Sequence, residues 1–167
     1  MYATLSDLHT AISTELVRVG DSAVTARLPE FVKLAEARLF NGDEAIGVAP
    51  VRCREMETRA TLTFTDGAST TPADFLEARR LTWAGAIPSR LKYTEPDAFY
   101  SSVYVATPQA SGYPLLFTIE GTAVDILPRA SGTATLSYYA KPAGLTLPGD
   151  TNTVLSSQRQ LYLFSAL

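Results

Sequence analysis

Two segments near the start of the chain carry the three- and four-residue spacing of apolar positions that is typical of amphipathic helices. The first covers residues 4–19, where Thr4 and Asp7 form a capping-box pattern because hydroxyl and carboxylate groups satisfy the free amides of a first turn. Gly20 suits the end of this helix. The apolar positions that share one face are Leu5, Leu8, Ile12, Leu16 and Val19.

The second predicted helix runs from Pro29 to the pair Asn41-Gly42, because proline is suited to a first helical turn and Asn-Gly ends helices well. Over residues 1–50 we expect the two helices to pair as an antiparallel hairpin. The expected apolar face of the second helix is Phe31, Leu34, Ala35 and Leu39.

From residue 56 the apolar spacing changes to the alternation of a half-buried strand, which predicts a strand over residues 56–64 followed by a turn at Asp66-Gly67. Residues 71–83 are typical of an extended segment with one compact turn near its start. Leu91 and Tyr93 indicate a further strand, and Pro96 begins a single helical turn.

The segment from 113 to 141 predicts a hairpin that turns at residues 120–122, ends at Pro128 and is followed by a third strand. We expect these three consecutive antiparallel strands to form a meander. Residues 51–141 as a whole then predict one antiparallel β module, either a sheet or a sandwich.

Residues 142–153 are rich in Pro, Gly and Thr and predict a connector. Ser157 with Gln160 resembles a capping box for a last helix, with Leu161, Phe164 and Leu167 on its apolar face. Because the pattern stops on that face without a cap, we expect the natural chain to continue. The predicted fold class is α+β, with the module inserted in a helical bundle that residues 142–167 complete.

The composition predicts a folded, soluble chain, since 46% of the residues are hydrophobic and 19% are charged. The formal net charge is −3, and acidic and basic residues are spread evenly without a basic stripe. This charge excludes a bulk electrostatic clamp on DNA or on an anionic membrane. The longest apolar runs are much shorter than a membrane span.

The side chains that usually carry catalysis are sparse. His9 is the only histidine, it lies within the first helix, and no G-x-S-x-G element accompanies it. Cys53 is the only cysteine, so an internal disulfide and a multi-thiolate zinc site are excluded. Its neighbours Arg52 and Arg54 would favour a thiolate, but an ordinary cysteine is the interpretation we prefer.

Carboxylate pairs and phosphate-binding motifs add no catalytic site. Glu55 with Glu57 and Asp43 with Glu44 lie in no recognisable acid–base context, and a solvated surface explains them. No phosphate loop, dinucleotide fingerprint, calcium loop or paired-histidine zinc helix occurs in the sequence. We therefore expect no enzyme activity, no cofactor and no metal.

Several tyrosines are candidates for stacking on sugars or bases, but few basic residues accompany them in the sequence. Positions in the core or at subunit interfaces are the preferred interpretation. The tyrosines in question are Tyr93, Tyr100, Tyr104, Tyr113, Tyr138 and Tyr139.

Five segments together resemble the head-to-tail adaptor (connector) proteins of tailed bacteriophages, in particular those of podovirus-type tails. LPEFVKLAEARLF resembles the second helix of the family, and TPADFLEARRLTW resembles its LP-x-DF-L-E-x-R segment, although Thr71 stands where Leu is usual. LLFTIEGTAVDILP, LSYYAKPAGL and the closing RQLYLFSAL follow in the order of the family. The resemblance covers most of residues 28–167.

The resemblance implies a structural virion protein of the neck or tail, made in the cytoplasm of a bacterial host. It implies a dodecameric ring of identical subunits beneath the portal protein, which extends the DNA channel and seats a downstream tail component such as a nozzle or tail tube. DNA would pass through the lumen without specific binding, and no membrane is involved. The C-terminal region of such proteins often helps to dock on the portal.

Two alternatives remain open at this point. One is a β-sandwich binding module, for example for a carbohydrate, which would be monomeric and align exposed tyrosines on one sheet face. The other is a different phage ring protein, such as a tail terminator or stopper. Candidate contacts between subunits or with the portal are charged helix positions, which a solvated helix face explains equally well, namely Arg27, Lys33, Glu36 and Arg38.

Overall fold

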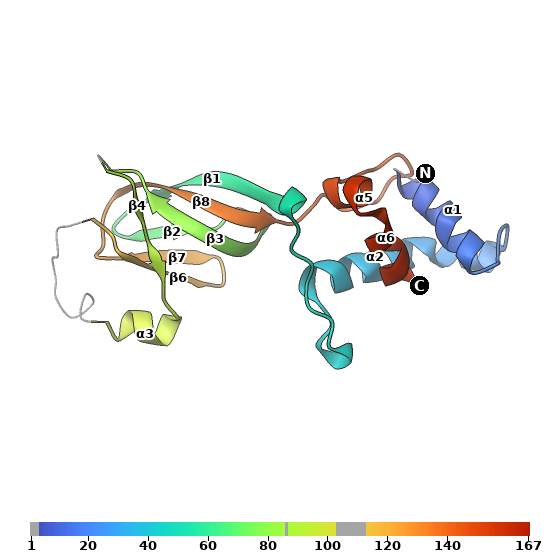
Figure 1. The fold of residues 1–167 in the computed structure, drawn as a ribbon, viewed down its shortest axis with the longest axis horizontal. Helices are drawn as coiled ribbons and strands as arrows, with labels where there is room; N and C mark the ends of the chain where they lie inside the picture. Colours follow the sequence, from blue (N-terminus) through green and yellow to red (C-terminus); the bar gives the residue numbers. More distant parts are fainter. Residues whose placement is uncertain (1–3, 86, 103–112) are drawn as a thin grey trace. The chain divides into compact units, whose positions relative to one another are not determined.

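The computed structural model describes residues 4–85, 87–102 and 113–167. The chain forms two compact units (Figure 1). A helical unit combines Met1–Met56 with Lys141–Leu167, and a β module comprises Glu57–Ala140. The predicted α+β fold class is confirmed, with helices at both ends of the chain and two sheets between them.

Helix α1 spans Leu5–Glu15, and its predicted capping box is present. The Asp7 amide donates to Thr4 Oγ1 at 3.3 Å, and the Thr4 amide donates to Asp7 Oδ2 at 3.2 Å. The helix ends before the expected stop at Gly20, with Leu16 as its C-cap and Val17 at a φ of +53°. The apolar face is therefore shorter than predicted and consists of Leu5, Leu8 and Ile12.

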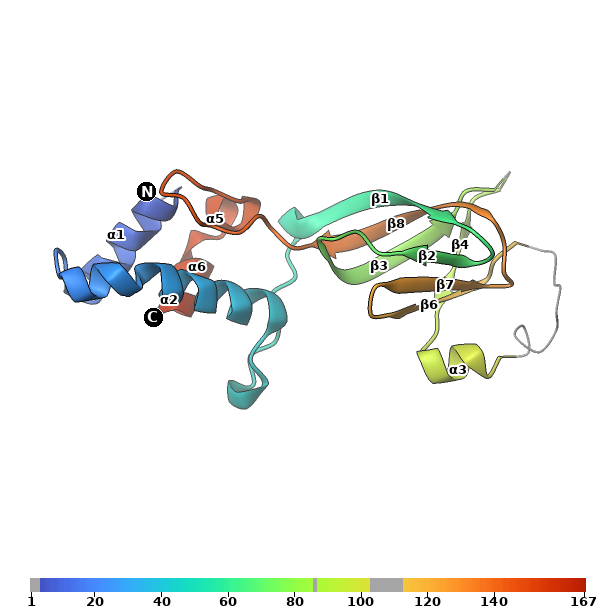
Figure 2. The ribbon, with the colours of Figure 1, turned by 180° about the vertical axis from the view of Figure 1, so that it is seen from behind.

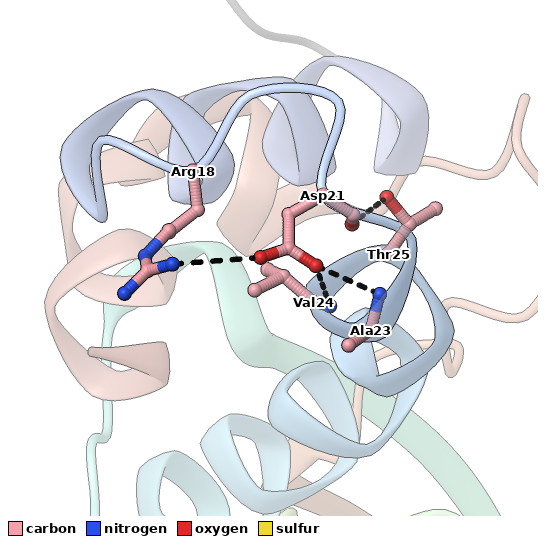
Figure 3. A network of polar contacts seen from close by, with 5 residues as sticks. All are labelled: Arg18, Asp21, Ala23, Val24 and Thr25. Carbon is pink, nitrogen blue, oxygen red and sulfur yellow. Dashed lines mark hydrogen bonds and ion pairs between the residues drawn. The ribbon is translucent and has the colours of Figure 1, made fainter.

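Helix α2 spans Ser22–Asn41, so it begins well before the predicted start at Pro29. Figure 3 shows the reason, which is a polar network that caps the helix at Asp21. Asp21 Oδ1 accepts from the amides of Ala23 at 2.9 Å and Val24 at 3.4 Å. Arg18 lies 3.7 Å from the other carboxylate oxygen. The helix then continues through Pro29, whose missing amide costs one hydrogen bond within the helix.

The buried face of α2 packs chiefly against the C-terminal helix α6 (Arg159–Ala166) and less against α1 (Figure 2). This face includes the predicted Ala35 and Leu39, but Leu34 is 58% exposed instead of buried. Most of its residues are spaced three and four positions apart, as expected for one side of a helix. Its buried residues are Leu28, Val32, Ala35, Leu39 and Phe40.

The C-terminal segment forms two short helices, α5 (Thr153–Ser157) and α6, instead of one. The predicted capping box at Ser157 is wrong, because Ser157 is the last residue of α5 and Asn152 caps that helix. The break at Gln158 changes the phase of the helical face. The buried residues of α6 are accordingly Tyr162 and Leu163, whereas Phe164 is 71% exposed.

The β module consists of two four-stranded sheets (Figure 1). The first sheet has the order β1 (Glu57–Phe64), β8 (Gly132–Ala140), β3 (Phe75–Trp83) and β4 (Ser89–Arg90). The second has the order β2 (Ala68–Thr70), β7 (Ala123–Leu127), β6 (Leu116–Glu120) and β5 (Lys92–Tyr93). The module also contains the predicted helical turn α3 (Pro96–Tyr100), whereas the 3-10 turns η1 (Glu44–Ile46) and η2 (Arg54–Met56) belong to the helical unit.

The predicted hairpin is present as β6 and β7, with Ile119 opposite Val124. The predicted meander is wrong, because β8 leaves this sheet and lies between β1 and β3 in the other one. Strand β7 already has β2 and β6 on its two sides, so it offers no free edge to β8. The buried alternate residues of β8 face the core shared with the second sheet, and they are Ala134, Leu136 and Tyr138.

Candidate interaction surface

The exposed side of α2 carries an apolar residue between two arginines. Arg27, Leu34 and Arg38 are seven and four residues apart, a spacing that places them on one helical face. Leu34 is 58% exposed. We call these three residues the α2 outer face. Lys33 is exposed but lies on a different side of the helix.

Arg38 is anchored within its own chain. Its Nε lies 3.7 Å from Asp43 Oδ2, and its Nη1 donates to the carbonyl of Ser165 at 3.4 Å. The side chain is still 48% exposed, so it presents a positioned charge to solvent. Arg27 and Lys33 have no carboxylate within ion-pair distance among the described residues.

Glu36 differs from the expected exposed position. It is half-buried, and its Oε1 accepts from the Leu145 amide at 3.1 Å, which ties the connector to α2. Burial raises the pKa of this carboxyl, while the Leu145 amide, the charge of Lys141 and the Tyr162 hydroxyl partly oppose the rise. Glu36 thus has a role inside the helical unit.

Other large apolar side chains of the helical unit also face solvent. Val17 and Val19, in the connection between α1 and α2, are 86% and 73% exposed, and Phe164 of α6 is 71% exposed. Single exposed apolar residues are ordinary, and they become candidate contacts only where a partner covers them.

The side chains considered for catalysis do not form a site. Nε2 of His9 is buried without a hydrogen-bond partner among the described residues, and burial lowers its pKa, so the ring is neutral near pH 7. Burial and the neighbouring Glu55 raise the pKa of Cys53, which contradicts a favoured thiolate. Arg52 is turned away to the carbonyls of Phe40 and Val51.

Metal-binding groups and the paired carboxylates were the other candidates for a chemical site. Within residues 4–85, 87–102 and 113–167, no group of three or more His, Cys, Asp or Glu side chains is placed to hold a metal ion. Glu57, one of the paired carboxylates, forms an ion pair with Arg79. None of the helices that the structure describes is long and apolar enough to cross a membrane.

The tyrosines divide between core and surface. Tyr138 is buried and donates to Asp74 Oδ1 at 2.9 Å. Tyr93 on β5, Tyr100 on α3 and Tyr113 outside the strands are 46%, 46% and 54% exposed. These three come from different kinds of element and do not line one sheet face, so the carbohydrate-binding alternative gains no support. Tyr104 lies outside the described residues.

Together these features define an α+β protein with an exposed, partly apolar helical surface and no catalytic arrangement among the described residues. The family profile of the SU10 adaptor protein matches residues 3–167, and the chain therefore belongs to the SU10 adaptor protein family. The resemblance to phage head-to-tail adaptors is thereby confirmed, and the protein is a phage adaptor protein and a virion component. No curated protein matches the chain.

Proposed function

We propose that this adaptor forms a dodecameric ring beneath the portal protein, where it extends the DNA channel and seats the next tail component. Membership in the adaptor family over residues 3–167 carries this proposal. The subunit supplies shape and contacts, and no bond is made or broken.

The helical unit supplies the contacts with neighbouring subunits and with the portal. Leu34 of the α2 outer face offers an apolar centre, and Arg27 and Arg38 flank it with charge. Interfaces commonly combine an apolar centre with a charged rim that sets orientation. Lys33 adds a third exposed cation, on a different side of the same helix.

A channel wall must let DNA pass during ejection, which requires weak interaction with phosphates. The formal charge of −3 suits this requirement, because protein–DNA affinity depends mainly on neutralised phosphates. We therefore propose that DNA crosses the lumen without specific binding.

Co-sedimentation with the portal protein of the same phage tests the proposal. The adaptor should sediment with portal rings at a stoichiometry of one adaptor ring for each portal ring, and electron microscopy of the complex should show a second ring. Light scattering on the adaptor alone is not decisive, because a subunit that assembles only on the portal is monomeric without it. A full-length protein that never binds the portal, or that binds only tail tubes as a terminator does, would contradict the proposal.

A further inference from the structure

The β module contains a cleft that is lined by residues of both sheets. The cleft has a volume of about 630 Å³ and lies between β3 of one sheet and β5 and β6 of the other. Its apolar lining includes the buried Leu91 and Phe117 and the half-buried Phe75, Ala78 and Ile119. We call it the edge cleft. A cavity of this size with an apolar floor takes a few side chains of a ligand.

The topology concentrates the positive charge of the module at this cleft. Of the six Lys and Arg residues between positions 57 and 140, four line the cleft, whereas only one of the eight Asp and Glu residues, Glu77, does so. The local sequence shows no basic stripe because the four cations come from two separate segments. They are Arg79, Arg80, Arg90 and Lys92.

Three of these cations are available to a ligand. Arg79 forms an ion pair with Glu57 and lies over the ring of Tyr139, 5.5 Å from its centroid. Arg80, Arg90 and Lys92 are exposed, and no carboxylate of the described residues lies within ion-pair distance of them. Three unpaired cations around an apolar floor favour a ligand that brings carboxylates and an apolar group together.

The strand beside the cleft also has backbone groups to offer. Over residues 75–80, β3 pairs with β8 on one side only, since β4 pairs with Thr82 and Trp83. Register shifts at 75–77 and 78–80 interrupt this edge, and such bulges prevent a long flat strand from extending the sheet. Between the two shifts only Glu77 and Ala78 keep a regular register, so this edge offers a partner only a short stretch of backbone.

We propose that the edge cleft binds a short, extended, acidic segment of a partner protein, with one apolar side chain in the cleft and carboxylates on Arg80, Arg90 and Lys92. The inference rests on the proposed function and names the chemistry of the tail component that the adaptor seats. A short segment is favoured over nucleic acid, because the seven acidic residues of the module outside the cleft repel a long polyanion.

The test uses the full chain and a fluorescein-labelled peptide that contains Glu-Asp-Leu-Glu-Asp, with polarisation as the readout. We expect binding in the millimolar range or tighter, which weakens as NaCl rises from about 50 mM to about 500 mM. A neutral peptide with Gln-Asn-Leu-Gln-Asn and a peptide with Ser in place of Leu should each bind about tenfold more weakly.

The variant that tests the cleft is R80Q/R90Q, and the matched control is R59Q, which removes an exposed cation of the same module outside the cleft. R80Q/R90Q should weaken peptide binding by about tenfold, and R59Q should leave it within about twofold. Circular dichroism melting of each variant checks that it folds.

Several outcomes would overturn the proposal. One is that the acidic peptide does not bind at millimolar concentration, and others are that the neutral peptide binds equally well or that R80Q/R90Q leaves binding unchanged. Duplex DNA that displaces the labelled peptide at a lower concentration than unlabelled peptide does would favour nucleic acid as the ligand. Self-association that R80Q/R90Q abolishes would favour a second copy of the chain. Portal co-sedimentation separates this test from that of the proposed function. R80Q/R90Q should bind the peptide about tenfold more weakly but keep the portal, whereas a wild-type protein that binds the peptide and never the portal refutes only the proposed function.

Discussion

The side-chain amide of Asn152 donates a hydrogen bond to the hydroxyl of Tyr162 at 2.7 Å in the interior of the helical unit. The same amide group donates to the carbonyl of Ala143 at 3.0 Å, and Oδ1 accepts from the Leu155 amide at 2.8 Å. Tyr162 is fully buried and Asn152 is 8% exposed. One residue thus joins the connector, the start of α5 and the centre of α6.

Removal of this junction should destabilise the helical unit. We expect Asn152→Ala to lower the free energy of unfolding by about 2–4 kcal/mol, because it removes a helix cap and leaves buried polar groups unpaired. Tyr162→Phe removes the hydroxyl, which accepts from Asn152 and also hydrogen-bonds Glu36, and should cost about 1–2 kcal/mol. Urea denaturation followed by circular dichroism measures both. Tyr139→Phe, at a half-buried position of the β module, is the control, and a loss as large as that of Tyr162→Phe would contradict the assignment.

The half-buried carboxyl of Glu36 should make stability depend on pH. Its pKa is raised above the ordinary value of 4.5, chiefly by burial, so the folded state holds the proton more tightly than the unfolded state. This contribution to stability is complete below pH 4.5 and is lost as pH rises through the folded-state pKa. Glu36→Gln should remove that decline, because the amide side chain does not titrate. Its carbonyl can still accept from the Leu145 amide, so the contact with the connector is kept.

Urea denaturation of the wild type and of Glu36→Gln across a pH series checks this prediction. The two proteins should be most alike at low pH and should differ in favour of the variant toward neutral pH. Glu30→Gln, at an exposed position of the same helix, is the matched control. A wild-type advantage that grows with pH would show that the ionised carboxylate stabilises the fold.

Leu34 should be dispensable for folding but needed for assembly. It is 58% exposed, so Leu34→Asp should change the free energy of unfolding by no more than about 0.5 kcal/mol. The same variant should lose co-sedimentation with the portal, because it places a charge at the apolar centre of the α2 outer face. Val32→Ala, at a position 1% exposed on the same helix, should instead cost about 2 kcal/mol of stability. Unchanged portal binding by Leu34→Asp would remove Leu34 from the proposed interface.

The hydroxyl of Tyr138 should set an alkaline limit for the β module. Burial and the bond to Asp74 raise its pKa from 10.0 to about 12. Since the folded state holds this proton more tightly, the contribution to stability is complete below pH 10 and is lost as pH rises through about 12. Tyr138→Phe should flatten this loss. Tyrosinate absorbance and circular dichroism measure the transition, and identical alkaline profiles for the wild type and Tyr138→Phe would contradict the prediction.

The periodicity of the sequence was sufficient for the fold class and for most strands, because alternation and turn residues are local signals. The prediction was wrong where contacts between segments far apart in the sequence determine the structure. The β8 strand left the predicted meander because β2 and β6 occupy both sides of β7, a fact that no local pattern contains. The start of α2 was missed because Asp21 caps it from within a stretch without strong periodicity.

The same distinction applies to the candidate surfaces. Arg27 and Arg38 could be placed on one helix face from their spacing, whereas the inward position of Glu36 depends on a hydrogen bond from Leu145, far along the chain. The edge cleft could not be predicted from the sequence. Its cations occupy two short segments, and they meet at one opening because β4 pairs with β3 and because β3 lies opposite β5 and β6.

The chain enters the β module on β1 and leaves it on β8, and these strands pair with Glu57 opposite Tyr139. The two ends of the module are therefore neighbours, and 84 residues act on the rest of the chain as a tight loop would. Because the folded module itself holds its two ends together, and because closure entropy rises only slowly with the number of residues enclosed, a longer module would add little entropy cost. Insertions or replacements within the β module can thus be accommodated while the helices keep their packing.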